Sequence, residues 1–257
     1  MLAGSTLGNR LACRGVTTFA DVLAQRLRAD PGQPLVTYYD LGTGERVELS
    51  VTTYANWVAK TASLLAEEHD LERGQSLRVD LPVHWLGPVF LGAAWAIGLT
   101  VTEDDEPDAV VCGPDSLARW ASYADRLPVL ACSLLPMGVR FADALPPGVH
   151  DVGVDVWSQP DAFAPWDPPA GTDPAVDWAG AELTHDELWS RAAAGTSHYS
   201  GGGRLLSTAN PASPSGLSAF TGPLGGSGSV VLVSGSSGED LTRVFEAERC
   251  TDRFEPA

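Results

Sequence analysis

The sequence predicts an α/β fold in which a largely parallel sheet is flanked by helices. Residues 75–81 alternate between polar and apolar side chains, as a half-buried strand does. The segment 81–102 contains no Asp, Glu, Lys or Arg, which is typical of a fully buried helix. After Gly98, residues 99–101 resemble a second strand. Strand, buried helix and strand in this order form a parallel βαβ unit.

The uncharged segment 81–102 is also long enough for a membrane span. Pro82, Pro88 and His84 lie within it and disfavour that alternative. We therefore expect a helix at 86–97 that is buried between the sheet and its neighbouring elements.

Before this unit, the sequence predicts a helix, a hairpin and a second helix. Residues 19–27 carry apolar side chains on one helical face. Residues 35–40 and 46–49 are expected to pair as a hairpin. The second helix begins near Ser50, whose hydroxyl can accept a free backbone N–H. Its apolar face is formed by Tyr54, Trp57, Val58, Thr61, Leu64 and Leu65.

After the unit, strands and helices alternate. Further strands are expected at 108–112, 129–135, 150–157 and 230–233. Further helices are expected at 114–127, 140–145 and 240–249. We expect one domain over 1–257, divisible into subdomains 17–157 and 174–250 that a Pro-rich connector, 158–174, joins. Phe163 and Trp166 predict that this connector packs on the core.

Several motifs resemble the AMP-forming acyl-CoA synthetase and adenylation-domain superfamily, also called the AMP-dependent synthetase and ligase or ANL superfamily. T-T-Y-A-N-W at 52–57 resembles its L-T-Y-x-E-L motif. L-E-R-G-Q-S-L-R-V at 71–79 resembles G-V-x-x-G-D-R-V, and F-L-G-A-A-W-A-I-G at 90–98 resembles A-L-L-A-x-x-x-A-G. The resemblance covers most of this chain but only the N-terminal part of a full relative. It therefore implies a truncated and degenerate N-terminal domain of an adenylate-forming enzyme. It also implies strands at 173–176 and 203–208 and a helix at 182–188.

The resemblance also identifies the region where active relatives hold ATP. They carry T-S-G-T-T-G-x-P-K-G there, because backbone N–H groups and hydroxyls bind the phosphates and a lysine offsets their charge. Here residues 176–182 are V-D-W-A-G-A-E, with one glycine, no hydroxyl and no cation. Asp177 and Glu182 would repel phosphate. We therefore expect no triphosphate site in this segment.

Three residues flank this degenerate loop and are the candidate binding residues: Gly180, Thr184 and His185. The resemblance assigns no catalytic residue, no metal ligand and no cofactor, and ATP with magnesium is expected only if the family activity is retained. For His185, a packed or solvated ring after a helix-capping Thr184 is favoured over a catalytic role. The glycine-rich segment 234–238 can hold an anion at a helix start, but no lysine follows it and a plain turn is favoured.

Composition excludes several classes of partner. The net charge of −17 disfavours nucleic acid and anionic membrane surfaces. Cys13, Cys112, Cys132 and Cys250 form no C-x-x-C pair, so neither zinc nor a redox centre is indicated. We expect free thiols in the cytoplasm, because the N-terminus lacks the apolar core of a signal peptide. Scarce Asn, Lys and Met indicate a bacterial source.

Three functions are compatible with these observations. The first, which we favour, is a non-catalytic, truncated relative of AMP-dependent acyl-CoA synthetases that binds an unknown small molecule or protein. The second is half of a split acyl- or aryl-CoA ligase that another polypeptide completes. The third is an unrelated α/β interaction protein, which a structure without a parallel sheet would favour.

Overall fold

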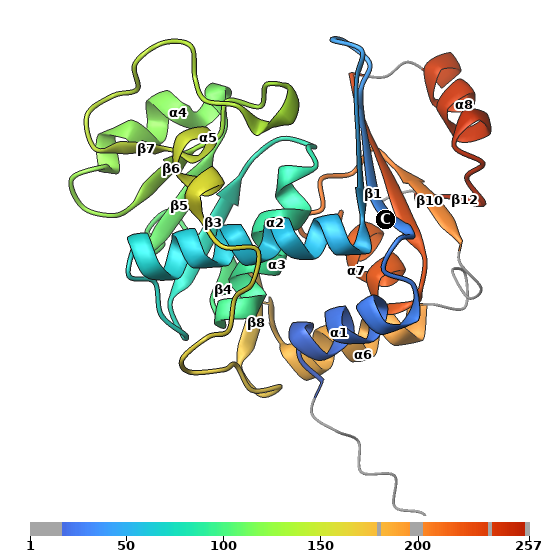
Figure 1. Ribbon diagram of the computed structural model, residues 1–257, viewed down its shortest axis with the longest axis horizontal. Coiled ribbons are helices and arrows are strands. Elements are labelled where there is room, and N and C mark those ends of the chain that lie inside the picture. Colours follow the sequence, from blue (N-terminus) through green and yellow to red (C-terminus); the bar gives the residue numbers. More distant parts are fainter. Residues whose placement is uncertain (1–16, 179–180, 196–202, 236–237, 255–257) are drawn as a thin grey trace, which may run out of the picture.

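The computed structural model describes residues 17–178, 181–195, 203–235 and 238–254, and it contains two sheets (Figure 1). One sheet has seven strands in the order β7-β6-β5-β3-β4-β8-β9, and the other has five in the order β12-β10-β11-β1-β2. In Figure 1 the two sheets stand side by side with helices between them. The layered arrangement positions the candidate site, because the ends of both sheets reach the same region.

The seven-stranded sheet is parallel except for its last strand, so the predicted fold class is confirmed. The strands that we predicted near 77–81, 99–101 and 109–112 are adjacent in it. Its strands are β3 (Ser76–Asp80), β4 (Thr100–Thr102), β5 (Ala109–Cys112), β6 (Val129–Ala131), β7 (Val149–Asp151), β8 (Pro174–Trp178) and β9 (Ala181–Thr184).

Helix α3 (Leu86–Ile97) is the buried helix that the uncharged segment predicted. All of its residues except Ala96 are buried, and the left-handed Gly98 ends it. It packs on β3 and β4 and is covered by α2 (Val51–Ser63). Among the described residues, no helix combines the length and the apolar character needed to span a membrane, and α3 has 12 residues. The buried core interpretation of this segment is therefore confirmed.

The five-stranded sheet combines the two ends of the chain. Strands β1 (Pro34–Asp40) and β2 (Glu45–Ser50) form the predicted antiparallel hairpin, and β1 runs parallel to β11 (Ser229–Ser234). Strand β11 also runs parallel to β10 (Arg204–Ser207), which pairs with β12 (Asp252–Phe254). Strand β12 was not predicted from the sequence.

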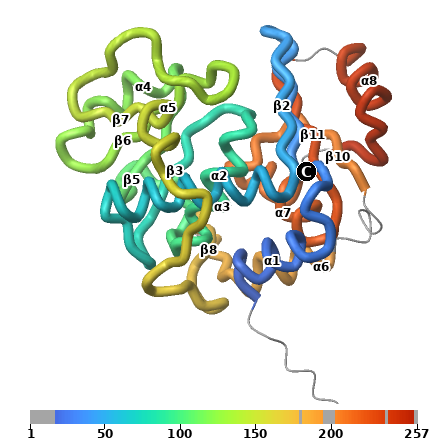
Figure 2. Tube along the Cα trace, in the orientation of Figure 1, coloured from blue at the N-terminus to red at the C-terminus, as the bar shows by residue number. Residues whose placement is uncertain are grey.

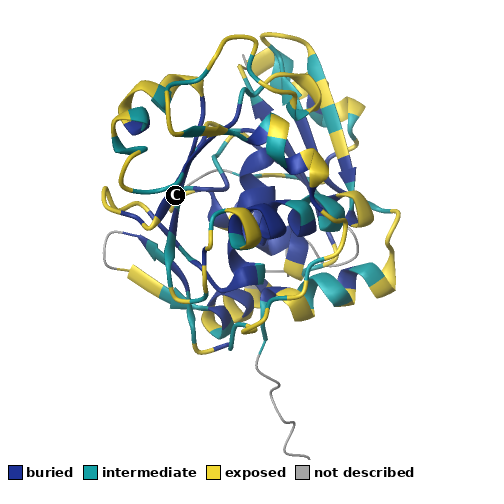
Figure 3. Ribbon diagram, turned by 60° about the vertical axis from the view of Figure 1, so that its left-hand side comes forward, coloured by how far each residue is buried: buried dark blue, intermediate teal, exposed yellow. Residues whose placement is uncertain are grey.

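Successive residues of a strand face opposite sides of its sheet, and both sides of each sheet are covered. The result is five layers in the order helices, sheet, helices, sheet, helices. In β5, Val111 belongs to the central core while Val110 belongs to a second core with Trp120 of α4 (Pro114–Trp120). In β11, Val230 faces the central core and Val231 faces α8 (Gly238–Ala247). The central layer between the sheets holds α1 (Phe19–Ala29), α2, α3, α6 (His185–Gly195) and α7 (Leu217–Gly225). Buried residues accordingly gather at the centre in Figure 3.

Several elements differ from the prediction. The strand expected at 129–135 is only β6, and the helix expected at 182–188 begins at His185, because residues 181–184 form β9. Residues 140–145 are not helical, and the backbone N–H of Phe141 donates instead to Asp151 (2.9 Å). The strand predicted at 150–157 ends already at Asp151, the last residue of β7. It is followed by α5 (Val152–Asp155) and a 3-10 turn. Asp151 caps this helix, since its side chain accepts from the N–H of Gly153 (3.0 Å).

The connector (Figure 2, yellow) follows the prediction at one aromatic residue and departs from it at another. Phe163 packs against the core, whereas Trp166 is 102% exposed. The predicted subdomains 17–157 and 174–250 do not coincide with the sheets, because β1 pairs with β11 and β8 pairs with β4. Whether those segments fold separately stays a prediction.

Glu248 is the centre of a polar cluster on the five-stranded sheet. It bonds to Arg46 (2.9 Å), Arg204 and Tyr39, and its side chain is 9% exposed. Burial raises its pKa, but the bonds from Arg46, Tyr39 and Arg204 outweigh burial and lower that pKa to about 2. The stability that Glu248 contributes is therefore complete above its ordinary pKa of 4.5, and is lost as the pH falls from there toward about 2.

We expect Glu248→Gln to lower the free energy of unfolding by about 2 kcal/mol at pH 7, because Arg46 and Arg204 then share Glu48 as their remaining carboxylate partner. Urea unfolding followed by circular dichroism measures the change. The matched control is Glu246→Gln, since Glu246 is exposed on the adjoining helix. Equal stability of both variants would contradict the assignment.

Candidate functional site

The carboxyl ends of the two sheets meet at one place, which we call the sheet junction and define by Tyr38, His84, Asn210 and Ser234. The side-chain amide of Asn210, beyond β10, donates to the carbonyl of Leu81, beyond β3 (2.7 Å). The rings of Tyr38 and His84 lie 4.7 Å apart across the same boundary. Ligands of open parallel α/β sheets bind outside the carboxyl ends of the strands. The sheet junction is therefore the candidate site of this fold.

His84 is the most unusual residue of the sheet junction. It is 2% exposed and lies between the rings of Tyr38 (4.7 Å) and Trp85 (5.5 Å). Its Nδ1 accepts from the N–H of Leu86 (3.2 Å), so in the neutral ring the proton is on Nε2. Nε2 is buried and has no partner among the described residues. The ring therefore offers an N–H donor that no group in the described part of the chain uses.

Burial lowers the pKa of His84 to about 4, although Asp40 raises it in part. The imidazole is neutral at pH 7 and is poorly matched to proton transfer, for which a pKa near the working pH is best. An unpaired buried donor costs about 1–3 kcal/mol. Such a donor is suited to binding a polar group of a ligand.

Hydroxyl groups supply the other side of the sheet junction. Tyr38 Oη and Ser234 Oγ are 2.9 Å apart, and burial raises the pKa of Tyr38, so the phenol stays neutral. Asp40 lies nearby, but its carboxylate accepts from Gly42 (2.8 Å) and Thr43 (2.9 Å) and thereby holds the β1–β2 turn. The four residues that define the sheet junction thus carry neutral polar groups, and none of them is a cation that could pair with a phosphate.

The segment that would form a phosphate loop is a tight hairpin. Trp178 of β8 pairs directly with Ala181 of β9, so only residues 179–180 separate the paired positions. Asp177 pairs with Glu182, which sets two carboxylates opposite each other. Neither the length of the connection nor its charge fits a triphosphate with magnesium. Gly180, one of the predicted binding residues, lies outside the described residues.

Thr184 and His185 lie at the other end of the β8–β9 pair from the turn at residues 179–180. Thr184 pairs with Pro174 at the amino end of β8, and the N–H of His185 donates to the carbonyl of Asp173 (3.0 Å). Thr184 caps α6, since its hydroxyl accepts from Glu187 N–H (3.3 Å) while the Glu187 carboxylate accepts from Thr184 N–H (3.0 Å). The capping role proposed for Thr184 is thus present.

His185 is fully buried, and neither ring nitrogen has a partner among the described residues. Burial lowers its pKa to about 4, against smaller raising effects of Asp173 and Asp186. The ring is therefore a neutral part of the core. The structure does not bring it to the sheet junction, so the two neutral histidines, His84 and His185, occupy separate environments.

His84, Tyr38 and Ser234 were not predicted from the sequence to form one site. His84 was noted only as a polar residue within an apolar segment. A useful signal was available, because His84 follows the carboxyl end of a predicted parallel strand, where ligands of such sheets bind.

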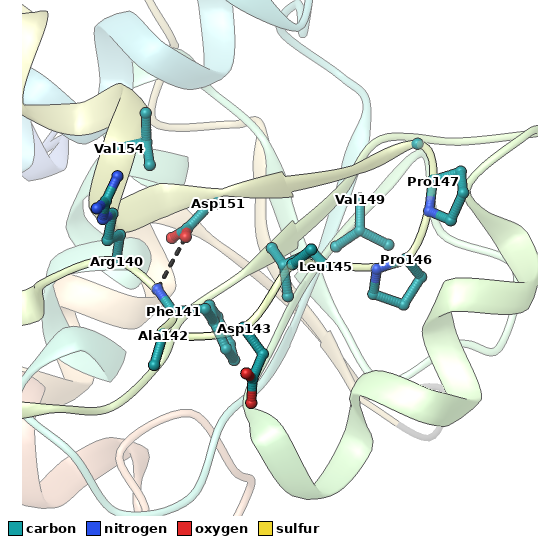
Figure 4. Close-up of a pocket in the computed structure, with 12 residues that line it drawn as sticks. Arg140, Phe141, Ala142, Asp143, Leu145, Pro146, Pro147, Val149, Asp151 and Val154 are labelled. Atoms are coloured by element: carbon teal, nitrogen blue, oxygen red, sulfur yellow. Dashed lines mark hydrogen bonds between the residues drawn. The ribbon is translucent and has the colours of Figure 1, made fainter.

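A separate hollow of about 570 Å³ lies beside β7, at the edge of the seven-stranded sheet (Figure 4). The loop 140–149 lines it, together with Asp151 and Val154. Figure 4 shows that Asp151 is directed at the backbone of Phe141, so this carboxylate holds the loop. The hollow has no buried and unpaired polar group comparable with His84 Nε2.

No family model matches the chain. A curated protein of Mycobacterium tuberculosis, described as a TIGR03089 family protein, is 36% identical over an alignment of 239 residues that covers 90% of this chain and 95% of the relative. The chain belongs to the TIGR03089 family.

Solved structures show which fold this TIGR03089 family member has. An acyl-CoA synthetase of Brucella canis superposes with a TM-score of 0.77 at 17% identity, covering 93% of this chain and 47% of the synthetase. A mutant coronafacic acid ligase of Pectobacterium brasiliense gives 0.70 at 12% identity, covering 92% of this chain and 50% of the ligase. The chain thus has the fold of acyl-CoA synthetases and spans about half the length of these two enzymes.

Proposed function

We propose that this TIGR03089 family member is a non-catalytic relative of AMP-forming acyl-CoA synthetases that binds a small molecule or a protein. The observation that carries the proposal is the β8–β9 hairpin. Two residues separate Trp178 from Ala181, where active relatives are expected to have a glycine-rich and lysine-containing loop. A connection of two residues is far shorter than a glycine-rich loop whose backbone N–H groups wrap a phosphate chain.

The charge of the hairpin supports the same proposal. Forming an acyl-adenylate requires donors and a magnesium ion that stabilise charge developing on the phosphates. Asp177 and Glu182 are carboxylates on paired positions of the hairpin. They increase the negative charge that ATP would meet, so neither ATP nor magnesium is expected as a cofactor.

The sheet junction is the proposed binding site. It supplies one imidazole N–H and the hydroxyls of Tyr38 and Ser234. These groups suit a ligand with an uncharged acceptor group. The cytoplasm is the proposed location, which the buried thiols of Cys112, Cys132 and Cys250 support; Cys13 lies outside the described residues.

Carboxylate-dependent exchange of labelled pyrophosphate into ATP tests the proposal, with a panel of fatty and aryl acids. We expect no exchange above an enzyme-free blank, because loss of even one preorganised donor slows such chemistry by about 10²–10³. A heat-denatured sample is the matched control. Exchange that survives repurification would overturn the proposal, and ATP binding without exchange would favour a regulatory nucleotide site.

A split ligase is the remaining enzymatic alternative. Exchange that arises only when a second polypeptide is added would favour it over a binding module. The unrelated α/β protein is disfavoured by the parallel sheet and by the similarity to acyl-CoA synthetases.

A further inference from the structure

Arg73 holds the last part of the Pro-rich connector, residues 167–173, on the core. The guanidinium of Arg73 donates to both carboxylate oxygens of Asp173 (2.7 and 2.9 Å). It also donates to the carboxylate of Asp167 (3.0 Å) and to the carbonyl of Pro168 (3.2 Å). These hydrogen bonds from Arg73 fix the connector next to residue 166. The four bonds also use the positive charge of Arg73 within the protein.

Trp166 projects from this fixed segment. Its exposure of 102% means that the large indole makes almost no contact with the rest of the chain. Tryptophan ordinarily buries about 150–250 Å² of surface, so a fully exposed one on a rigid segment is energetically unusual. An indole that a rigid segment holds in water is available for a partner.

A hollow of about 360 Å³ lies directly beside Trp166. Leu71 and Ile97, which are 4% and 3% exposed, belong to its lining together with Phe163. These side chains give the hollow an apolar floor. An alkyl chain of a few carbons fits such a volume.

Two carboxylates complete the lining. Glu67 and Glu72 are exposed, and neither side chain has a cationic partner within the described ranges. Arg73 and Asp167 also line the hollow, but they neutralise each other. The hollow therefore combines an apolar floor, an exposed indole and two uncompensated negative charges.

We propose that this hollow docks an arginine or lysine side chain of a partner protein. The alkyl stem would contact Leu71 and Ile97, while the cationic head would lie between the indole of Trp166 and the carboxylates of Glu67 and Glu72. Aromatic faces attract such cations, and desolvation strengthens the attraction. The chain's net charge of −17 also favours the approach of a basic partner. This site is independent of the sheet junction and of the function proposed for it.

Nuclear magnetic resonance of the ¹⁵N-labelled indole groups tests the proposal on the full chain. The Trp166 signal is identified by its loss in Trp166→Phe. N-butylguanidinium is the probe, because it carries the stem and the head of arginine. We expect a saturable shift of the Trp166 signal with the guanidinium and none with N-butylurea, which has nearly the same shape but no charge. An equal shift with the urea, or no shift, would overturn the proposal.

Substitution of Glu67 and Glu72 tests whether their charges contribute to binding of N-butylguanidinium. We expect Glu67→Gln and Glu72→Gln each to weaken binding of the probe about fivefold, since one exposed charge pair is lost. Glu106→Gln is the matched control, because Glu106 is an exposed carboxylate in a different loop. Unchanged affinity in both hollow variants would contradict the assigned role of the carboxylates.

A last comparison separates a protein-borne side chain from a free amine. The blocked peptide acetyl-Gly-Arg-Gly-amide should shift the same signal at least as strongly as agmatine does. Binding of agmatine with exclusion of the peptide would overturn the docking role and leave a small-molecule site.

Discussion

Replacing Gly92 with alanine is expected to lower the free energy of unfolding by about 3 kcal/mol. A Cβ at this position would lie 2.3 Å from Tyr54 Oη, 2.8 Å from Val58 Cγ2 and 2.9 Å from Phe19 Cζ. These side chains are 0%, 3% and 1% exposed, so they have no free space to enter. Overpacking of this kind costs about 1–3 kcal/mol.

The same methyl group would also disturb a buried hydrogen bond. Tyr54 Oη donates to the carbonyl of Pro88 (2.9 Å), and displacing the hydroxyl leaves both groups unpaired in the core. An unpaired buried polar group costs about 1–3 kcal/mol. The two effects share a cause, because α3 approaches α1 and α2 closely only where Gly92 lacks a side chain.

Urea unfolding of Gly92→Ala measures the effect, and Gly87→Ala in the same helix is its control. A Cβ at Gly87 would meet only Asn210 Oδ1, at 4.0 Å. Alanine favours a helix more than glycine does, so we expect the control to be as stable as the original protein or slightly more stable. A Gly92→Ala variant within about 0.5 kcal/mol of the original protein would show that the helices can separate without loss.

The protein is expected to lose stability at pH values above those at which carboxylates titrate. His84 and His185 have pKa values lowered to about 4 by burial, against an ordinary value of 6.5 in the unfolded chain. Well above pH 6.5 the two histidines are neutral in both the folded and the unfolded chain, so they cause no pH dependence of stability. Between pH 6.5 and about 4 the unfolded state binds protons that the folded state cannot, so stability falls with the pH.

One pKa unit corresponds to about 1.4 kcal/mol, so each histidine removes about 2 kcal/mol at pH 5 and the pair removes about 4 kcal/mol. Unfolding in urea at pH 7.5 and at pH 5 measures this loss. The variant His84→Asn with His185→Leu should lose much less stability over the same interval. Asparagine can still accept from Leu86, and neither replacement titrates. Equal pH dependence of variant and original protein would contradict the buried neutral rings.

Local patterns predicted most of the fold, because a parallel βαβ unit has a simple signature in sequence. The uncharged helix at 86–97 and the alternating strand before it required no knowledge of distant residues. The segment 150–157 was misassigned since its valines fit two periods. Val152, Val154 and Val156 alternate as in a strand, but Val152 and Val156 are also four residues apart, as on a helix. The structure buries Val152 and Val156 and leaves Val154 52% exposed, which is the helical pattern.

The candidate site was harder to predict than the fold. His84 follows a predicted parallel strand, but its partners Tyr38 and Ser234 come from strands at the two ends of the chain. No local pattern shows that the two sheets meet there. The absence of a phosphate loop was a prediction from composition, but the two-residue hairpin required the strand register. Trp166 was expected to pack inward, because an aromatic residue in a Pro-rich segment ordinarily does so.

The β8–β9 hairpin also limits how this chain could change. Substitutions at residues 179–180 can introduce a glycine or a lysine, but they cannot lengthen a connection that the pairing of Trp178 with Ala181 fixes at two residues. A phosphate-binding loop at this position therefore requires an insertion. Tips of hairpins are sites where insertions are tolerated. The hairpin is thus the position at which a glycine- and lysine-containing loop can be grafted to ask whether this scaffold still supports nucleotide binding.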